Sequence, residues 1–147
     1  MSLKDQLNES MKTAMKARDD LRLSAVRMVR SMVKNREIEQ KAELNDQEII
    51  EVISTLAKQR RESIRMYREG NRPDLVEKEE AELEVLLGFL PAQLGIAEIE
   101  ALVDRIIAET GAQGARDMGR VMKALTPLTA GKADGKTVSD TVKQKLA

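Results

Sequence analysis

The stretch NDQEIIEVISTLAKQRRESIRMYREGNRP, residues 45–73, predicts one long helix with defined ends. Asn45 followed three residues later by Glu48 is the pattern of a capping box, in which each side chain accepts a hydrogen bond from the other residue's backbone N–H. Gly70 is typical of the position after a helix, and Pro73 lies just beyond it. Between these ends the apolar side chains recur every three or four positions, at Ile49, Val52, Ile53, Leu56, Ile64 and Tyr67.

The same helical spacing covers the rest of the chain and predicts an all-α fold. One stripe joins Leu3, Leu7, Met11 and Met15. A second joins Leu21, Ala25, Met28 and Met32 behind a cap at Asp19 and Asp20, and Val26, Val29 and Val33 widen it. Further helices are expected at about 74–87, 97–110 and 117–125, and a final one around Val138, Val142 and Leu146. The helix at 117–125 is expected to end before Pro127. Ala, Glu, Lys, Leu and Arg make up about half of the 147 residues, a composition typical of long helices.

Glycine usage predicts two domains. No glycine precedes Gly70, and six of the eight lie between Gly95 and Gly135. The linker Leu90–Gly95 separates the two compositions. We therefore expect a long-helix N-terminal domain over 1–93 and a small domain of shorter helices over 94–147.

The composition excludes most catalytic and metal-binding chemistry. The chain has no His and no Cys, which excludes Ser–His triads, thiol nucleophiles and thiolate zinc sites. We expect no catalytic constellation, no cofactor, no metal site and no small-molecule substrate. The longest uncharged run, residues 85–97, is short and is interrupted by Gly88, Pro91 and Gly95, so no membrane span is expected. Without an apolar export segment, the expected location is the cytoplasm.

The 25 basic and 25 acidic side chains are distributed in opposed blocks. Residues 12–36 hold eight basic and two acidic groups, and residues 74–84 hold one basic and six acidic groups. Two basic faces have helical spacing: Lys58, Arg61, Arg65 and Arg68, and Arg27, Arg30 and Lys34. Two interpretations stay open: acidic helices neutralise these faces in weak surface pairs, or the faces stay open and bind a phosphate backbone.

The last third of the chain carries a basic excess. Residues 111–147 hold seven basic and three acidic side chains, with no acidic block after them. Lys132 and Lys136 flank the expected start of the last helix, where backbone N–H groups and the helix dipole attract anions. An ordinary capped loop is the alternative. We predict that the nucleic-acid-binding residues are Arg120, Lys123, Lys132 and Lys136.

Seven short segments, in this order, carry a resemblance to a known family: LSAVRM (23–28), NREIE (35–39), KQRRES (58–63), EEAELE (79–84), LPAQL (90–94), DMGRVM (117–122) and GKADGK (131–136). Essentially end to end, the chain resembles the YqeY-like proteins of the GatB/YqeY family. The resemblance implies a helical protein whose C-terminal three-helix domain is similar to the tail domain of the B subunit of tRNA-dependent amidotransferases. That tail helps to hold tRNA while catalysis occurs elsewhere. Pro127 and residues 128–130 depart from the shorter turn expected there.

The resemblance and the basic tail together predict a bacterial, non-catalytic protein that acts as a tRNA-binding accessory module. An aminoacyl-tRNA synthetase or an amidotransferase component is the further partner that the resemblance implies. Because the only aromatic residues are Tyr67 and Phe89, we expect contacts to phosphates and RNA shape rather than base stacking. The alternative is a protein–protein interaction adaptor without RNA binding, which docks helices through its Met-rich stripes.

Overall fold

The computed structural model describes all 147 residues as seven α-helices and one short 3₁₀ helix, with no strand. The all-α prediction is therefore confirmed. The chain divides into two compact units, Met1–Pro91 and Ala92–Ala147. The division falls within the linker Leu90–Gly95, whereas the sequence placed it between residues 93 and 94. None of the helices combines the length and apolar character that crossing a bilayer requires.

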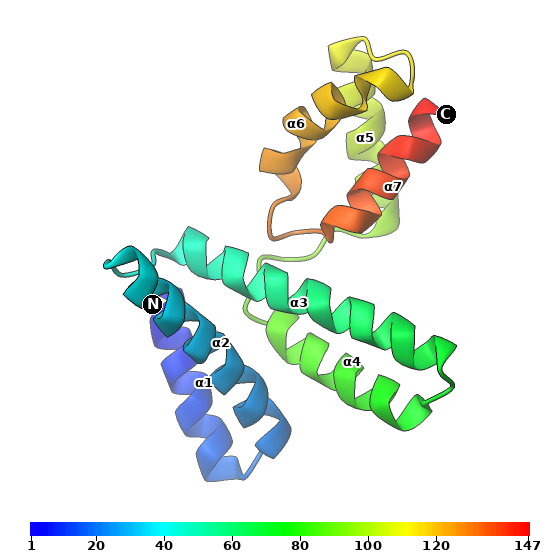
Figure 1. Ribbon diagram of the computed structural model, residues 1–147. Helices are drawn as coiled ribbons and strands as arrows, with labels where there is room; N and C mark the ends of the chain where they lie inside the picture. Colours follow the sequence, from blue (N-terminus) through cyan, green and yellow to red (C-terminus); the bar gives the residue numbers. More distant parts are fainter. The chain divides into compact units, whose positions relative to one another are not determined.

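The first unit consists of two helix pairs joined by short turns (Figure 1). Helix α1 (Leu3–Ala17) packs against α2 (Asp20–Gln40), and α3 (Asp46–Glu69) packs against α4 (Pro73–Leu87). Helix α2 also contacts α3 and α4, so the two pairs share one hydrophobic core. Its buried residues are Leu3, Leu7, Ala25, Val26, Val29, Val33, Leu44, Ile49, Val52, Ile53, Leu56, Val85 and Leu86.

Side-chain caps define where α2 and α3 begin. The Asn45 side chain accepts a hydrogen bond from the Glu48 backbone N–H at 2.8 Å, and Glu48 Oε1 accepts one from the Asn45 N–H at 3.1 Å. The predicted capping box is thus confirmed. Asp19 caps α2 through the N–H of Arg22. Helix α3 ends at Gly70 as expected, but the left-handed backbone conformation belongs to Asn71, with φ of 55°.

The apolar stripes predicted for α1 and α2 are wrong at two methionines. Met15 and Met28 are 51% and 45% exposed, whereas Ala14, which the α1 stripe omits, and Val29, which widens the α2 stripe, are buried. In α2 the buried residues are Ala25, Val26, Val29 and Val33, and Met28 lies about 115° around the helix from the centre of that face. In α1 the predicted stripe uses a step of four residues, which exceeds the 3.6-residue turn and rotates the stripe by about 40° at each step. From Leu3 to Met15 the rotation reaches about 120°, which takes Met15 off the buried face.

The second unit is a three-helix domain. Helix α5 (Ile96–Thr110) ends at Gly111, whose φ of 68° is the left-handed conformation that favours glycine. A short 3₁₀ helix (Ala115–Asp117) leads into α6 (Met118–Thr129), and α7 (Gly135–Leu146) completes the domain (Figure 1). Its separate core consists of Ile99, Val103, Ile106, Val121, Leu125, Val138, Val142 and Leu146.

Helix α6 does not end before Pro127, which corrects the sequence prediction. The helix runs to Thr129, two residues beyond Pro127, which lies inside it. Proline removes one backbone hydrogen bond, but the turn it occupies is well packed. Thr129 is buried and donates to the Leu125 carbonyl at 3.2 Å, while Leu128 packs against the core. This burial keeps the last turn helical, so the stretch that departed from the family pattern is the end of α6.

Candidate nucleic-acid interface

The basic face of α3 is partly neutralised by α4. Arg68 forms an ion pair with Glu80, and Arg61 also has an interaction partner. Lys58 and Arg65 are exposed and form no ion pair. Neutralisation by an acidic helix therefore describes part of this face, and an open basic face describes the rest.

An ion-pair cluster that the sequence did not predict lies between α3 and α4. Arg60 Nε is 2.9 Å from Glu82 Oε2 and 3.3 Å from Glu79 Oε2. The three side chains are only 19%, 9% and 15% exposed in the order Arg60, Glu82, Glu79. Arg60 was missed because it lies outside the spacing of the exposed cations. Its position midway between Leu56 and Ile64, on the apolar stripe, is the sequence signal that Arg60 faces another helix.

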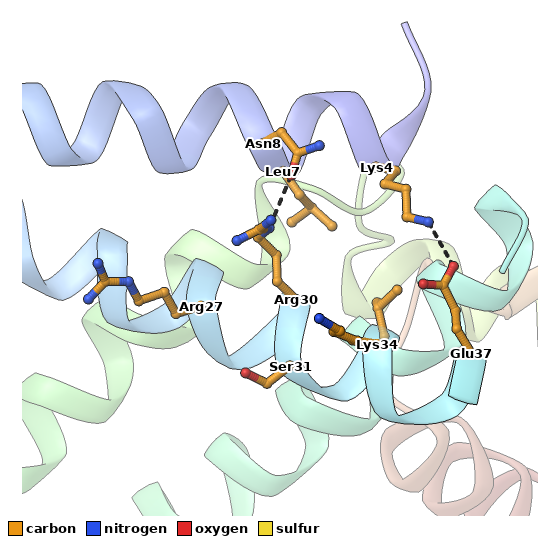
Figure 2. Close-up of a pocket in the computed structure, with 9 residues that line it drawn as sticks. Lys4, Leu7, Asn8, Arg27, Arg30, Ser31, Lys34 and Glu37 are labelled. Atoms are coloured by element: carbon orange, nitrogen blue, oxygen red, sulfur yellow. Dashed lines mark hydrogen bonds and ion pairs between the residues drawn. The ribbon is translucent and has the colours of Figure 1, made fainter. Parts of the chain in front are cut away.

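The second basic face lines a groove between α1 and α2 with a volume of about 440 Å³ (Figure 2). Arg27, Arg30 and Lys34 of α2 belong to its lining, and all three are exposed. Arg30 Nε donates to Asn8 Oδ1 of α1 at 3.0 Å. The remaining lining residues are Lys4, Leu7, Ser31, Val33 and Glu37, with Asn8.

Lys4 and Glu37 form the shortest charged contact of this groove, at 2.7 Å between Nζ and Oε2. The hydrogen bond from Lys4 lowers the pKa of Glu37, and a second hydrogen bond from the Leu44 backbone N–H lowers that pKa further. The same contact with Glu37 raises the pKa of Lys4. Both groups are therefore charged at neutral pH and neutralise each other. The lining retains three cations, Arg27, Arg30 and Lys34, and no other carboxylate.

In the second unit, the four predicted contacts fall into two classes. Lys123 on α6 and Lys132 in the loop after it are exposed and form no ion pair. Arg120 lies 3.4 Å from Asp117, and Lys136 lies 3.2 Å from Asp140. Both are surface pairs within one turn of helix, which contribute about 0–1 kcal/mol.

Two carboxylates reduce the basic character of residues 111–147. Lys145 pairs with Asp104 of α5 at 3.3 Å, so an acidic helix before the tail neutralises part of its charge. Helix α7 has Asp134 at its N-cap, where the Thr137 hydroxyl donates to Asp134 Oδ2. This carboxylate already supplies negative charge at the helix N-terminus. The lysine side chains, rather than the helix N-terminus, are thus the groups available to an anion.

The backbone of the loop that carries Lys132 is held in place by the linker of the same unit. The Leu94 N–H donates to the Lys132 carbonyl at 2.8 Å, and the Gln93 side-chain amide donates to the Gly131 carbonyl at 2.8 Å. Gly131 has a φ of 74°, a conformation that side chains other than glycine rarely adopt. The position of Lys132 is therefore determined by tertiary hydrogen bonds and by this glycine.

The sequence profile described as "Yqey-like protein" matches residues 4–146. The chain belongs to the YqeY-like family. Its similar relatives include proteins named "Altered inheritance of mitochondria protein 41, mitochondrial". The relative from Lachancea thermotolerans is 39% identical over 107 residues, which is 70% of this chain and 57% of the relative. The relative from Kluyveromyces lactis is 36% identical over 69% of this chain and 55% of its own length.

A third relative with that printed name, from Pyrenophora tritici-repentis, is 30% identical over 95% of this chain and 78% of its own length. The chain spans just over half the length of the Lachancea and Kluyveromyces relatives that it matches. The printed names of these YqeY-like relatives assign neither a catalytic activity nor an RNA ligand.

These relatives correct two predictions, the bacterial source and the cytoplasmic location. All three are fungal proteins named as mitochondrial. The cytoplasmic prediction depended on the absence of an apolar export segment. Mitochondrial transit peptides are instead amphipathic and rich in Arg and Ser, so that criterion does not detect them.

Proposed function

We propose that this YqeY-like protein is a non-catalytic accessory protein that binds tRNA through its C-terminal unit. The observation that supports this most is the exposure of Lys123 and Lys132 without carboxylate partners. Unpaired surface cations release counterions from a phosphate backbone when they bind it, which is the main source of affinity for nucleic acids. Arg120 and Lys136 can add to the contact, because their weak surface pairs exchange easily for phosphates.

The expected mode is recognition of backbone and shape. The chain has a single Tyr and a single Phe, so stacking of splayed bases is not its means of binding. A protein without His or Cys lacks the usual groups for acyl or amide transfer, and chemistry on a bound tRNA would belong to a partner. An amidotransferase component or an aminoacyl-tRNA synthetase is the class of partner we propose. Since the relatives are named as mitochondrial, mitochondrial tRNA is the first ligand to test.

The test is a binding titration of the full chain with tRNA over a series of salt concentrations. The variant Lys123→Glu with Lys132→Glu is expected to lose at least about tenfold in affinity, and its salt dependence should fall by about one unit of slope per lysine. The matched control is Arg116→Glu with Lys143→Glu, since both residues are exposed, form no ion pair and lie in the same unit. The control is expected to lose much less affinity.

Three results would contradict the proposal. They are equal losses in the two double variants, absence of tRNA binding at low salt, and equal affinity for duplex DNA of the same length. One observation favours the adaptor alternative: Met15, Met28 and Met66 are exposed, each on a different helix. Partners that remain bound after nuclease treatment of a cell extract would favour the adaptor, and partners lost with the RNA would favour tRNA binding.

A further inference from the structure

We propose that the groove between α1 and α2 binds a compact oligophosphate, a small molecule with two or three linked phosphate groups. This groove lies within the first unit, and none of its residues belongs to the tRNA contact proposed for the second unit. The two proposals are therefore independent of each other.

The spacing of the cations favours a short anion. Arg27, Arg30 and Lys34 stand at positions i, i+3 and i+7 of α2, which extends over about 10 Å at a rise of 1.5 Å per residue. At 100° per residue, Arg27 and Lys34 lie nearly on one line, and Arg30 lies about 60° to one side of it. Figure 2 shows Arg30 extending from α2 toward Asn8 on α1. Three positive groups of one helix therefore line a short segment of the groove.

Arg30 is held in position before any ligand arrives. Its Nε donates to Asn8 Oδ1, and its Nη1 lies 2.9 Å from Met11 Sδ, which is a weak acceptor. A guanidinium has five N–H donors, so three remain for phosphate oxygens, in the planar arrangement that suits bidentate binding. A cation that is already positioned loses less conformational entropy on binding.

The charge balance of the groove is unfavourable without an anion. The only carboxylate in the lining, Glu37, is engaged by Lys4. Arg27 and Lys34 form no ion pair, and Arg30 has only neutral partners. The three like charges repel one another, and a ligand with several negative charges removes that repulsion. The hydroxyl of Ser31, also in the lining, can donate a further hydrogen bond.

The shape of the groove favours a small ligand over an RNA strand. Its volume of about 440 Å³ falls within the range of small-molecule sites, about 300–1,000 Å³. Two bridges join the helices across it, Arg30 to Asn8 and Lys4 to Glu37 (Figure 2). A continuous strand along the groove would have to break both bridges. The buried Leu7 and Val33 form aliphatic walls, and no aromatic side chain is present to stack a base.

The test is calorimetric titration of the full chain with inorganic tripolyphosphate at low ionic strength. One site per chain is expected, with much weaker binding of sulfate at equal ionic strength. The variant Arg27→Gln with Lys34→Gln should lose at least about tenfold in affinity. The matched control is Lys58→Gln with Arg65→Gln, which removes two exposed, unpaired cations with the same seven-residue spacing on α3 and should keep the affinity within about twofold.

A third variant separates a built site from general ionic attraction. Asn8→Ala changes no charge but removes the acceptor that positions Arg30, so a severalfold loss of affinity is expected. Circular dichroism of every variant checks the fold. If the α2 double variant does not fold, the affinity of Asn8→Ala for tripolyphosphate is the test of the proposal. Equal losses in the α2 and α3 double variants, or unchanged affinity in either the α2 double variant or Asn8→Ala, would overturn the proposal.

A second arm distinguishes a free oligophosphate from an RNA backbone. Single-stranded RNA is titrated into the same proteins and used as a competitor of tripolyphosphate. If RNA displaces tripolyphosphate and loses as much affinity in the Arg27→Gln, Lys34→Gln variant, the groove is an RNA contact and the proposal is wrong. Tripolyphosphate binding should persist in Lys123→Glu with Lys132→Glu, so a failure of the tRNA proposal leaves this result unaffected.

Discussion

At the scale of single residues, Glu37 connects three parts of the first unit. It belongs to α2, accepts a hydrogen bond from Lys4 of α1 and accepts another from the backbone N–H of Leu44, just before α3. A glutamine at this position can keep the shape but not the charge. Because the folded state lowers the pKa of Glu37, its ionised form stabilises the fold.

The replacement Glu37→Gln should lower the thermal unfolding midpoint at pH 7. The ordinary carboxyl pKa of 4.5 is higher than the folded value, so the stabilisation is present above 4.5 and is lost as the pH falls through the folded value. The raised pKa of Lys4 has the opposite sign, and its contribution is present below 10.5 and is lost as the pH rises further. The difference between the two proteins should therefore be largest between these limits and shrink at pH 3.

Thermal unfolding followed by circular dichroism at pH 3 and pH 7 measures this difference. Glu43→Gln is the control, because Glu43 is 91% exposed and 3.9 Å from the same Lys4. An equal destabilisation at both pH values, or an equal effect of Glu43→Gln, would show that the Lys4–Glu37 pair does not act as described.

At the scale of helices, the α3–α4 pair contains two kinds of ion pair. Arg60 lies between Glu79 and Glu82 where the helices pack, and Arg68 pairs with Glu80 at the surface. Removing one partner of a buried pair leaves charge without compensation, which costs far more than losing a surface pair.

The replacement Arg60→Met should destabilise the first unit by about 3 kcal/mol, because methionine fills the space but leaves two poorly hydrated carboxylates side by side. Arg68→Met is the control on the same helix pair and should cost less than about 1 kcal/mol. Urea unfolding at pH 7 gives both free energies. Similar costs for the two variants would mean that water compensates Glu79 and Glu82 after Arg60 is removed.

At the scale of the whole molecule, each unit has its own core, with Leu125 at 0% exposure in the second. Small domains are stabilised by roughly 0.05–0.15 kcal/mol per residue, so the second unit has a stability of only a few kcal/mol. A single cavity in that core is therefore expected to remove a large part of the unit's stability.

The replacement Leu125→Ala should cost about 3 kcal/mol and unfold the second unit at lower temperature. The single tyrosine, Tyr67, belongs to α3 of the first unit, so its fluorescence reports that unit alone. The fluorescence midpoint should stay unchanged while part of the helical circular dichroism is lost earlier. A common shift of both signals would show that the two units unfold together. Leu128→Ala, at a half-buried position, is the milder control.

Features that depend on neighbouring residues in the chain could be predicted from the sequence: the helical class, the ends of α3, its capping box and most of the buried positions. Caps and the 3.6-residue repeat act within one or two turns, so they can be read without a partner element. The same local logic failed at Pro127, where core contacts kept the last turn of α6 helical.

The pairing of charges, in contrast, depends on how the helices pack. Lys4 and Glu37 are 33 residues apart in the sequence, and Arg60 pairs with residues of the next helix. The predicted cations of the candidate site are correspondingly divided, with Lys123 and Lys132 unpaired, and Arg120 and Lys136 paired. The physical reason is that a side chain's type is encoded locally, whereas its partner depends on which helix faces meet. The groove between α1 and α2 likewise forms only because faces of these two helices meet.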